Sequence, residues 1–353
     1  MLDDGCTIDY DWLVLALGSD TATFGVPGVV EHCAAFNTYT DAVALDNKLK
    51  EVQSASGAPA TAIVVGGGYA GVELAAVLAE RLGAGRVRVV AAGAGILEAA
   101  PAGQREAAAA KLAAVGVEVV AGAAVKHVAG GEGGRVSVSL AAPSSTPPPS
   151  LDADVVVWTA GVAPSGAPAA PPGSPALPFP RTAAGAVRVD ATLRVAGHPR
   201  VFALGDVAGA DGGAGAAPTA QVAFQQADYA AWNVWAAIAG RPALPFKYQH
   251  LGAMMSLGAG DGAVTLPVGL PARAAAAVAA SPLAPLLDAA GVRLSDPTGV
   301  TLAGPLGAAL RRAAYWYRQP TGGQRAAVGA AWLDAAAKRF GAGRPPTMGG
   351  GSE

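Results

Sequence analysis

Three glycines at a fixed spacing are the residues of this chain with the clearest chemical meaning. Gly66, Gly68 and Gly71 follow an apolar run, residues 61–65. In this pattern the first glycine permits a tight turn, the second lets the backbone approach a pyrophosphate, and the third lets a helix pack closely on a strand. The N-terminus of that helix would face the phosphate groups. The spacing therefore predicts a dinucleotide-binding site.

The elements around these glycines support the prediction, which the bare pattern alone would not, because glycine supplies 48 of the 353 residues. Residues 72–78 favour a helix, and residues 86–90 form a second apolar run one helix length later, as a βαβ unit requires. Gly67 and Tyr69 lie within the same turn, and we expect both to contribute to the cofactor site. The alternative is a glycine-rich loop without a ligand.

The composition argues against several other kinds of function. The formal net charge of −2 gives no reason to expect nucleic-acid binding. No uninterrupted apolar stretch reaches the roughly 18 residues that a membrane-spanning helix needs. The two cysteines, Cys6 and Cys33, form no CxxC pair, and the four histidines are scattered. We therefore expect neither a dithiol redox centre nor a metal site.

Segments on both sides of the glycine turn resemble those of flavoproteins in which an NAD(P)H domain interrupts an FAD domain. The matching segments are residues 10–19, the unit opened by Gly66, residues 154–161 and residues 199–206. The resemblance implies that Gly18, Gly161 and Gly205 lie against bound FAD. It also implies that Asp206 accepts a hydrogen bond from the ribityl chain, since a carboxylate ending a buried strand needs polar partners. The alternative is an aspartate that only stabilises a turn.

The expected fold is α/β, with two Rossmann-like dinucleotide-binding domains and a C-terminal helical region that associates with a membrane. An earlier glycine-rich strand, which binds the FAD pyrophosphate in that family, is absent from the printed sequence, so we expect an FAD domain truncated at its N-terminus that binds FAD poorly. The expected segments are an FAD-domain remnant and connector (1–57), the NAD(P)H-binding domain (58–162), a Pro/Ala-rich insertion (163–181), the returning FAD domain with a quinone-site helix (182–262) and the membrane-associating region (263–353). A second proline-rich insertion is expected at 143–149.

A helix is predicted over residues 218–229, with Thr219 as its N-cap. Gln221 and Gln225 stand four residues apart and share one face. This helix resembles the AQxAxQQ helix of type II NAD(P)H:quinone oxidoreductases. The resemblance implies that Ala220 and Gln221 face the flavin ring, where the helix dipole stabilises the reduced flavin anion, and that Gln221 and Gln225 line a quinone pocket. The alternative is a pair of solvated glutamines.

The same resemblance assigns roles to residues of the glycine-turn unit. Glu73 would lie near the nicotinamide and the flavin, where it relays protons or orders the site; alternatively, it only favours the N-terminal end of its helix. Tyr69 would cover the nicotinamide pocket. Ala91 stands about 20 residues past the fingerprint, where an NADH-specific unit places a carboxylate on the ribose. Because nothing would then repel a 2′-phosphate, we predict that NADPH is accepted at least as readily as in NADH-only relatives.

The C-terminal sequence resembles the plant, algal and cyanobacterial branch, which is plastid-associated and linked to plastoquinone and prenylated naphthoquinones. The matching segments are residues 245–258, expected as a closing strand pair, residues 304–307 and residues 315–320. From Pro271 onward, nine Lys and Arg residues face four Asp and Glu residues. A helical wheel places Leu306, Leu310, Ala313, Ala314 and Tyr317 on one side. Such a helix can lie in a membrane interface, or it can pack on the core or on a dimer partner.

The expected activity is that of an FAD-dependent, non-proton-pumping NAD(P)H:quinone oxidoreductase. A hydride passes from NAD(P)H to FAD, followed by two-electron reduction of plastoquinone, ubiquinone or a prenyl naphthoquinone. The alternatives are a soluble NAD(P)H-dependent flavin reductase with another acceptor, and an inactive fragment that binds only NAD(P). The resemblance further implies peripheral binding to a chloroplast membrane (thylakoid or plastoglobule) or a mitochondrial membrane surface, and a homodimer, for which the residues give no independent sign.

Overall fold

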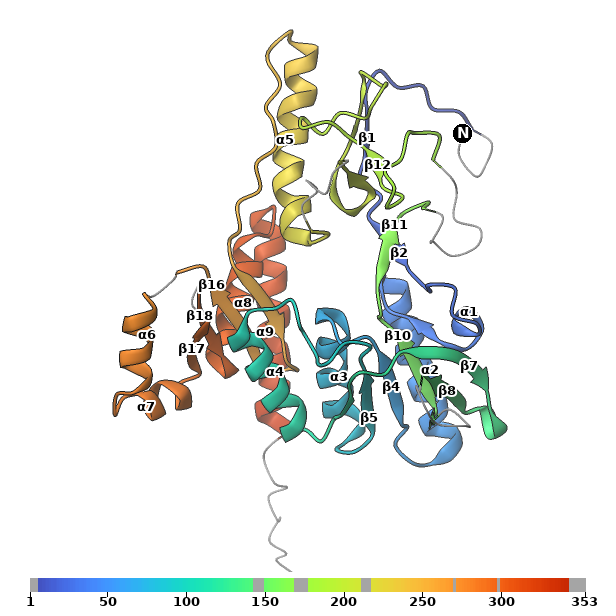
Figure 1. The fold of residues 1–353 in the computed structure, drawn as a ribbon, viewed down its shortest axis with the longest axis vertical. Helices are drawn as coiled ribbons and strands as arrows, with labels where there is room; N and C mark the ends of the chain where they lie inside the picture. The colour runs from blue at the N-terminus through green and yellow to red at the C-terminus, as the bar shows by residue number, and fades with distance from the viewer. Residues whose placement is uncertain are drawn as a thin grey trace, which may run out of the picture. The chain divides into compact units, whose positions relative to one another are not determined.

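The computed structural model describes residues 6–141, 149–167, 177–210, 217–268, 271–296 and 299–342. They belong to two compact units, Met1–Gly252 and Ala253–Glu353 (Figure 1). Most of the proline-rich insertion expected at 143–149, and the central part of the one expected at 163–181, lie outside the described residues.

A five-stranded parallel sheet organises the first unit. Its strands, in spatial order, are β3 (Ala34–Ala35), β10 (Val155–Trp158), β4 (Ala62–Val65), β5 (Val87–Val90) and β6 (Glu118–Val120). All residues of β4 and β10 are buried, which explains why both read as unbroken apolar runs. The predicted βαβ unit is confirmed: β4 leads into helix α3 (Tyr69–Leu82), which packs on β4 and β5.

Three further helices and a second sheet belong to the same part of the first unit. They are helices α1 (Val29–His32), α2 (Tyr39–Ser56) and α4 (Ala102–Ala114), and an antiparallel sheet of β7 (Val125–Gly130), β8 (Val136–Leu140) and β9 (Ser150–Ala153), with a short 3-10 turn, η1 (Glu132–Gly134), between β7 and β8. Val128 and Val138 from the antiparallel sheet share one buried cluster with Ile63 and Trp158 from the parallel sheet. The core therefore lies between the two sheets.

A half-buried polar contact joins the starts of β4 and β10. Both the backbone N–H and the hydroxyl of Thr61 donate to Asp154 Oδ2, at 2.7 and 2.6 Å, and Arg135 pairs with Asp154 Oδ1 at 3.1 Å. Although burial acts in the opposite direction, the hydrogen bonds from Thr61 and the charge of Arg135 lower the pKa of Asp154. The ionised carboxylate therefore stabilises the fold.

The rest of the first unit comes from both ends of its sequence. It contains β1 (Leu13–Leu15) paired with β13 (Val201–Ala203), β2 (Ser19–Thr21) with β11 (Val162–Pro164), β12 (Val187–Arg188) with β14 (Ala208–Gly209), the 3-10 turn η2 (Gly205–Val207) and helix α5 (Ala220–Ile238). Strand β1 is buried on one face only. Leu15 is buried, but Val14 is 44% exposed, because successive side chains of a strand point to opposite faces.

The second unit is built on a four-stranded antiparallel sheet. Its order is β15 (Ala253–Ser256), β16 (Gly262–Leu266), β18 (Gly299–Ala303) and β17 (Val292–Asp296), and its helices are α6 (Ala272–Ala279), α7 (Ala284–Ala289), α8 (Gly304–Tyr317) and α9 (Gly322–Ala342). Thr265 and Thr301 face each other across β16 and β18 and share a buried hydroxyl hydrogen bond of 2.7 Å. In the described part of the chain, no helix combines the length and apolar character that crossing a bilayer requires.

Helix α8 packs on the sheet of its own unit mainly through small residues. Gly307 and Ala308 are buried, and a Cβ on Gly307 would collide with the Leu302 carbonyl oxygen, so small residues form the contact with the sheet. Leu306 is 49% exposed and Tyr317 is 72% exposed. The alternative of a helix packed on the core therefore holds for Gly307 and Ala308, whereas Leu306 and Tyr317 leave apolar surface exposed.

Candidate functional site

The glycine turn between β4 and α3 has a distinct geometry at each of its glycines. Gly66 has a φ of 127°, and a Cβ there would lie 2.7 Å from the Thr159 carbonyl, so only glycine fits. A Cβ on Gly71 would collide with the Gly66 carbonyl oxygen, which shows how closely the helix crosses the turn. Around Gly68, by contrast, no atom lies within 4 Å of the Cβ position. Open space at this glycine leaves room for a ligand to approach the backbone.

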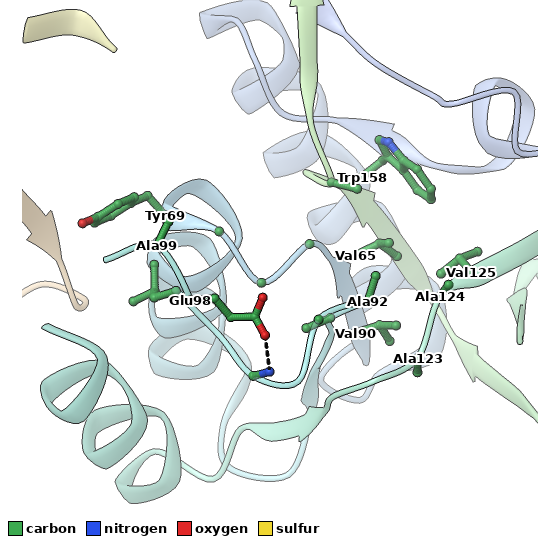
Figure 2. Close-up of a pocket in the computed structure, with 18 of the residues that line it drawn as sticks. Val65, Tyr69, Val90, Ala92, Glu98, Ala99, Ala123, Ala124, Val125 and Trp158 are labelled. Atoms are coloured by element: carbon green, nitrogen blue, oxygen red, sulfur yellow. Dashed lines mark hydrogen bonds between the residues drawn. The ribbon is translucent and has the colours of Figure 1, made fainter. Parts of the chain in front are cut away.

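A cavity of about 520 Å³ opens at this turn, within the size range of small-molecule sites. Its walls come from the glycine turn, the end of β5, the loop that follows β5, residues 123–125 and the buried Trp158 (Figure 2). Four of the predicted cofactor residues line it: Gly66, Gly67, Gly68 and Tyr69. Gly71 supports the turn from the helix side. Gly67 also packs against the end of β5, because a Cβ there would lie 2.8 Å from the Ala91 Cβ.

Tyr69 stands at the start of α3 with its ring held at one edge of this cavity. Its hydroxyl donates to Oε1 of the fully buried Gln104 at 2.7 Å. Burial, followed by the nearby charge of Glu73, raises the pKa of Tyr69, so the phenol keeps its proton and acts as a donor. Glu73 is half-buried on α3, one turn further along. Sequence reasoning missed Gln104, whose only signal is a polar side chain at the start of an alanine-rich helix.

A carboxylate that sequence reasoning overlooked lies in the same cavity. Glu98 Oε1 accepts a hydrogen bond from the Gly95 backbone N–H at 3.2 Å. Ala91 lines the cavity as well, and Glu98 is a carboxylate that the prediction of NADPH acceptance did not take into account. The loop after β5 brings Glu98 into this position, which spacing along the sequence alone does not reveal.

A second group of predicted residues gathers around the turn after β13. The Ser19 hydroxyl donates to Asp206 Oδ2 at 2.9 Å, and Gly205 has a φ of 70°. Gln226, in α5, accepts a hydrogen bond from the Gly205 N–H at 2.7 Å. A Cβ on Gly18 would meet no atom within 4 Å. Ser19 and Gln226 are further residues that sequence reasoning did not assign to the site, although each lies within a segment that it used.

The two glutamines of α5 hold the chain segment 248–252. Gln221 donates to the Gly252 carbonyl at 3.1 Å and accepts hydrogen bonds from the Tyr248 hydroxyl at 2.6 Å and the Leu251 N–H at 3.0 Å. Gln225 exchanges two hydrogen bonds with the Gln249 backbone, at 2.8 and 2.9 Å. The alternative of two glutamines bonded only to solvent therefore does not hold.

These contacts also explain why the closing strand pair is shorter than expected. Of residues 245–258, only Ala253–Ser256 forms a strand, since backbone groups of the preceding segment bond to α5 side chains instead. The predicted N-cap is confirmed, because Thr219 accepts a hydrogen bond from the Val222 N–H at 3.3 Å, and Ala220 begins the helix. Gly161 packs against the ring of Phe24 and is not among the residues that line the cavity.

The parallel sheet, the glycine turn and the cavity define a dinucleotide-binding α/β protein. The chain belongs to the pyridine nucleotide-disulphide oxidoreductase family, whose model matches residues 2–227.

Its sequence is similar to those of plant and cyanobacterial quinone reductases. It is 39% identical over 344 residues to the alternative NAD(P)H-ubiquinone oxidoreductase C1, chloroplastic/mitochondrial, of Arabidopsis thaliana, covering 94% of this chain and 60% of that protein. It is 37% identical over 330 residues to the demethylphylloquinone reductase NdbB of Synechocystis sp., covering 93% of this chain and 71% of that protein. The resemblance stated from the sequence is confirmed, although the chain spans only 60% of the length of the plant relative.

The fold is similar to that of NDH2 from Plasmodium falciparum in complex with NADH. The TM-score is 0.68, and the similarity covers 93% of this chain and 78% of that one. At 14% sequence identity, this similarity concerns the fold alone.

Proposed function

We propose that this chain carries the nicotinamide site and part of the flavin site of an FAD-dependent NAD(P)H:quinone oxidoreductase. The observation that supports the proposal most strongly is the glycine turn, in which Gly66 and Gly71 are required by packing while Gly68 is left open beside a cavity. The names of the plant and cyanobacterial relatives supply the quinone as the acceptor.

The residues at the glycine turn fit a dinucleotide. Gly68 allows the pyrophosphate to approach the backbone, and the first turn of α3 directs its free N–H groups and its dipole toward the phosphates. Tyr69, held by Gln104, borders the position of the nicotinamide, and Glu73 orders that end of the site through its charge beside the phenol. These residues bind and orient NAD(P)H.

The residues around Asp206 fit the flavin chain. The Asp206 carboxylate can accept further hydrogen bonds besides the one from Ser19. Gly205 has a left-handed backbone and no side chain, so no side-chain atom of this residue lies beside the carboxylate. The N-terminus of α5, at Ala220, offers a positive dipole end. When bound, FAD supplies the electron chemistry, taking a hydride from the nicotinamide and reducing the quinone by two electrons.

The glutamines of α5 contribute to the quinone site by holding its border in place. Gln221 and Gln225 fix residues 248–252 against the helix through their hydrogen bonds. A quinone between this segment and the flavin would meet a rigid wall, so these two residues act by positioning. Disulphide reduction is disfavoured, because Cys33 has its pKa raised to about 12 by burial and forms no pair with the exposed Cys6.

The second unit supports association with a membrane surface. Leu306 and Tyr317 expose apolar surface along α8, and Arg311 stacks on Tyr315 with its guanidinium carbon 5.1 Å from the ring centroid. Exposed aliphatic and aromatic residues next to arginines suit the headgroup region of a bilayer. The chloroplastic or mitochondrial location of the plant relative favours those membranes, and a homodimer is part of the same proposal.

The experiment that tests this function follows the visible spectrum of the purified chain with added FAD. Retention of flavin, bleaching by NADH under anaerobic conditions, and return of the oxidised spectrum when a short-chain quinone is added would support the proposal. Bleaching without reoxidation by quinone would point to a flavin reductase with another acceptor. Failure to retain flavin would contradict a flavin function of the chain by itself.

A further inference from the structure

Glu98 supplies the only charge among the described residues that line the cavity, and this charge is negative. Figure 2 shows its side chain extending into the cavity, with a hydrogen bond from the Gly95 N–H to the carboxylate. A Cβ on Gly93 would lie 2.5 Å from Oε2, so both carboxylate oxygens adjoin the loop that follows β5.

This location matters because of where a βαβ unit places its ligand. The ribose that carries the 2′-hydroxyl lies at the carboxyl end of the second strand, where a carboxylate commonly accepts its hydrogen bond. Here the second strand is β5, and its end carries Ala91 in place of an acidic residue. The loop then turns back, and the Leu97 N–H donates to the Gly67 carbonyl at 2.7 Å. This return brings Glu98 to the end of the strand.

We propose that Glu98 makes this cavity select NADH over NADPH, an inference that rests on the dinucleotide function proposed above. Its carboxylate can accept from the ribose hydroxyls of NADH. A phosphate monoester carries a charge of about −1.5 to −2 at pH 7, so the 2′-phosphate of NADPH meets a like charge. No lysine or arginine is among the described lining residues to offset this repulsion. Arg105 donates to the Glu98 backbone carbonyl at 2.9 Å and is not a lining residue.

Glu98→Gln tests the proposal, because glutamine keeps the shape and an acceptor for the Gly95 N–H while removing the charge. Calorimetric titration of the full chain with NAD⁺ and with NADP⁺ measures the two dissociation constants without requiring turnover. We expect the unsubstituted chain to bind NAD⁺ more tightly, and the variant to lose roughly tenfold of that preference, mainly through tighter NADP⁺ binding. Glu98→Arg should reverse the preference. Glu51→Gln, on the exposed side of α2, is the matched control and should leave the ratio unchanged.

The outcomes separate this inference from the proposed function. If both dinucleotides bind but Glu98→Gln leaves their ratio unchanged, or the unsubstituted chain prefers NADP⁺, the role of Glu98 is wrong while the dinucleotide site stands. If neither dinucleotide binds, both proposals fail. The preference should also weaken as salt rises, since the repulsion is electrostatic.

Discussion

The side-chain oxygen of Gln226 accepts a hydrogen bond from the backbone N–H of Gly205 at 2.7 Å, which links α5 to the turn that holds Asp206. Gln226 is only 8% exposed, so replacing it with leucine would leave the Gly205 N–H without its partner in a largely dry environment. We expect Gln226→Leu to lower the free energy of unfolding by about 1–3 kcal/mol and to weaken FAD retention. Gln226→Glu, which keeps an acceptor of the same shape, should retain more of both. Equal losses in the two variants, measured by urea unfolding and flavin titration, would contradict this role.

The glycine turn allows stability and binding to be separated. Gly68→Ala places a methyl group in open space, so the fold should be kept while NAD⁺ binds at least tenfold more weakly, because the methyl group blocks the pyrophosphate. Gly71→Ala places its methyl group against the Gly66 carbonyl oxygen and should lower the melting temperature instead. Calorimetry for binding and circular dichroism for unfolding measure the two effects. Unchanged NAD⁺ binding by Gly68→Ala would argue against a dinucleotide at this turn.

The contact between Thr61 and Asp154 predicts a dependence of stability on pH. The folded state lowers the pKa of Asp154, so its contribution is complete above the unfolded pKa of about 3.9 and disappears as the pH falls through the folded value. At pH 7 we expect Asp154→Asn to cost roughly 1–3 kcal/mol. The difference between the two proteins should shrink steadily below about pH 4. Urea unfolding at several pH values checks this, with Asp152→Asn at an exposed position of β9 as the control. A difference that stays constant down to pH 2 would contradict the prediction.

The exposed apolar side chains of Leu306 and Tyr317 on α8 predict binding to lipid. Leu306 is 49% exposed and Tyr317 is 72% exposed, so replacing both by glutamine removes mainly exposed apolar surface and should change stability little. Sedimentation with vesicles that contain anionic lipid should then show several-fold weaker binding. Tyr39→Gln, on the 85% exposed Tyr39 of the first unit, is the matched control and should bind as the unsubstituted chain does. If neither the chain nor its variants sediment with vesicles, the membrane proposal is wrong.

The sequence predicts those structural features that depend on residues close together in the chain. The turn at Gly66, the following helix and the second strand are encoded by local spacing, and so is the Thr219 cap. Glu98 could not be placed in the same way, because its position depends on a hydrogen bond between Leu97 and Gly67, which lie 30 residues apart in sequence.

Sequence patterns also could not tell which neighbours a side chain would contact when two environments were plausible for it. A helical wheel shows which residues share a face of α8 but does not show that Gly307 and Ala308 make the closest contact. The partners of Gln221 and Gln225 lie more than twenty residues away, so the pattern favoured a pocket or solvent over the backbone of residues 249–252. The boundaries of the expected domains, and the roles of the individual site residues, remain predictions.

The buried pair of Thr265 and Thr301 makes the second unit intolerant of misaligned folding. The two hydroxyls satisfy each other only when β16 and β18 pair as they do here. A slip of one strand by one residue would turn its threonine to the opposite face of the sheet and separate the two hydroxyls, at a cost of about 1–3 kcal/mol for each group left unsatisfied. Valine at both positions would fill the same space, but a slipped alignment would then leave no hydroxyl unsatisfied. The two threonines therefore favour the native alignment of β16 and β18 over a slipped one.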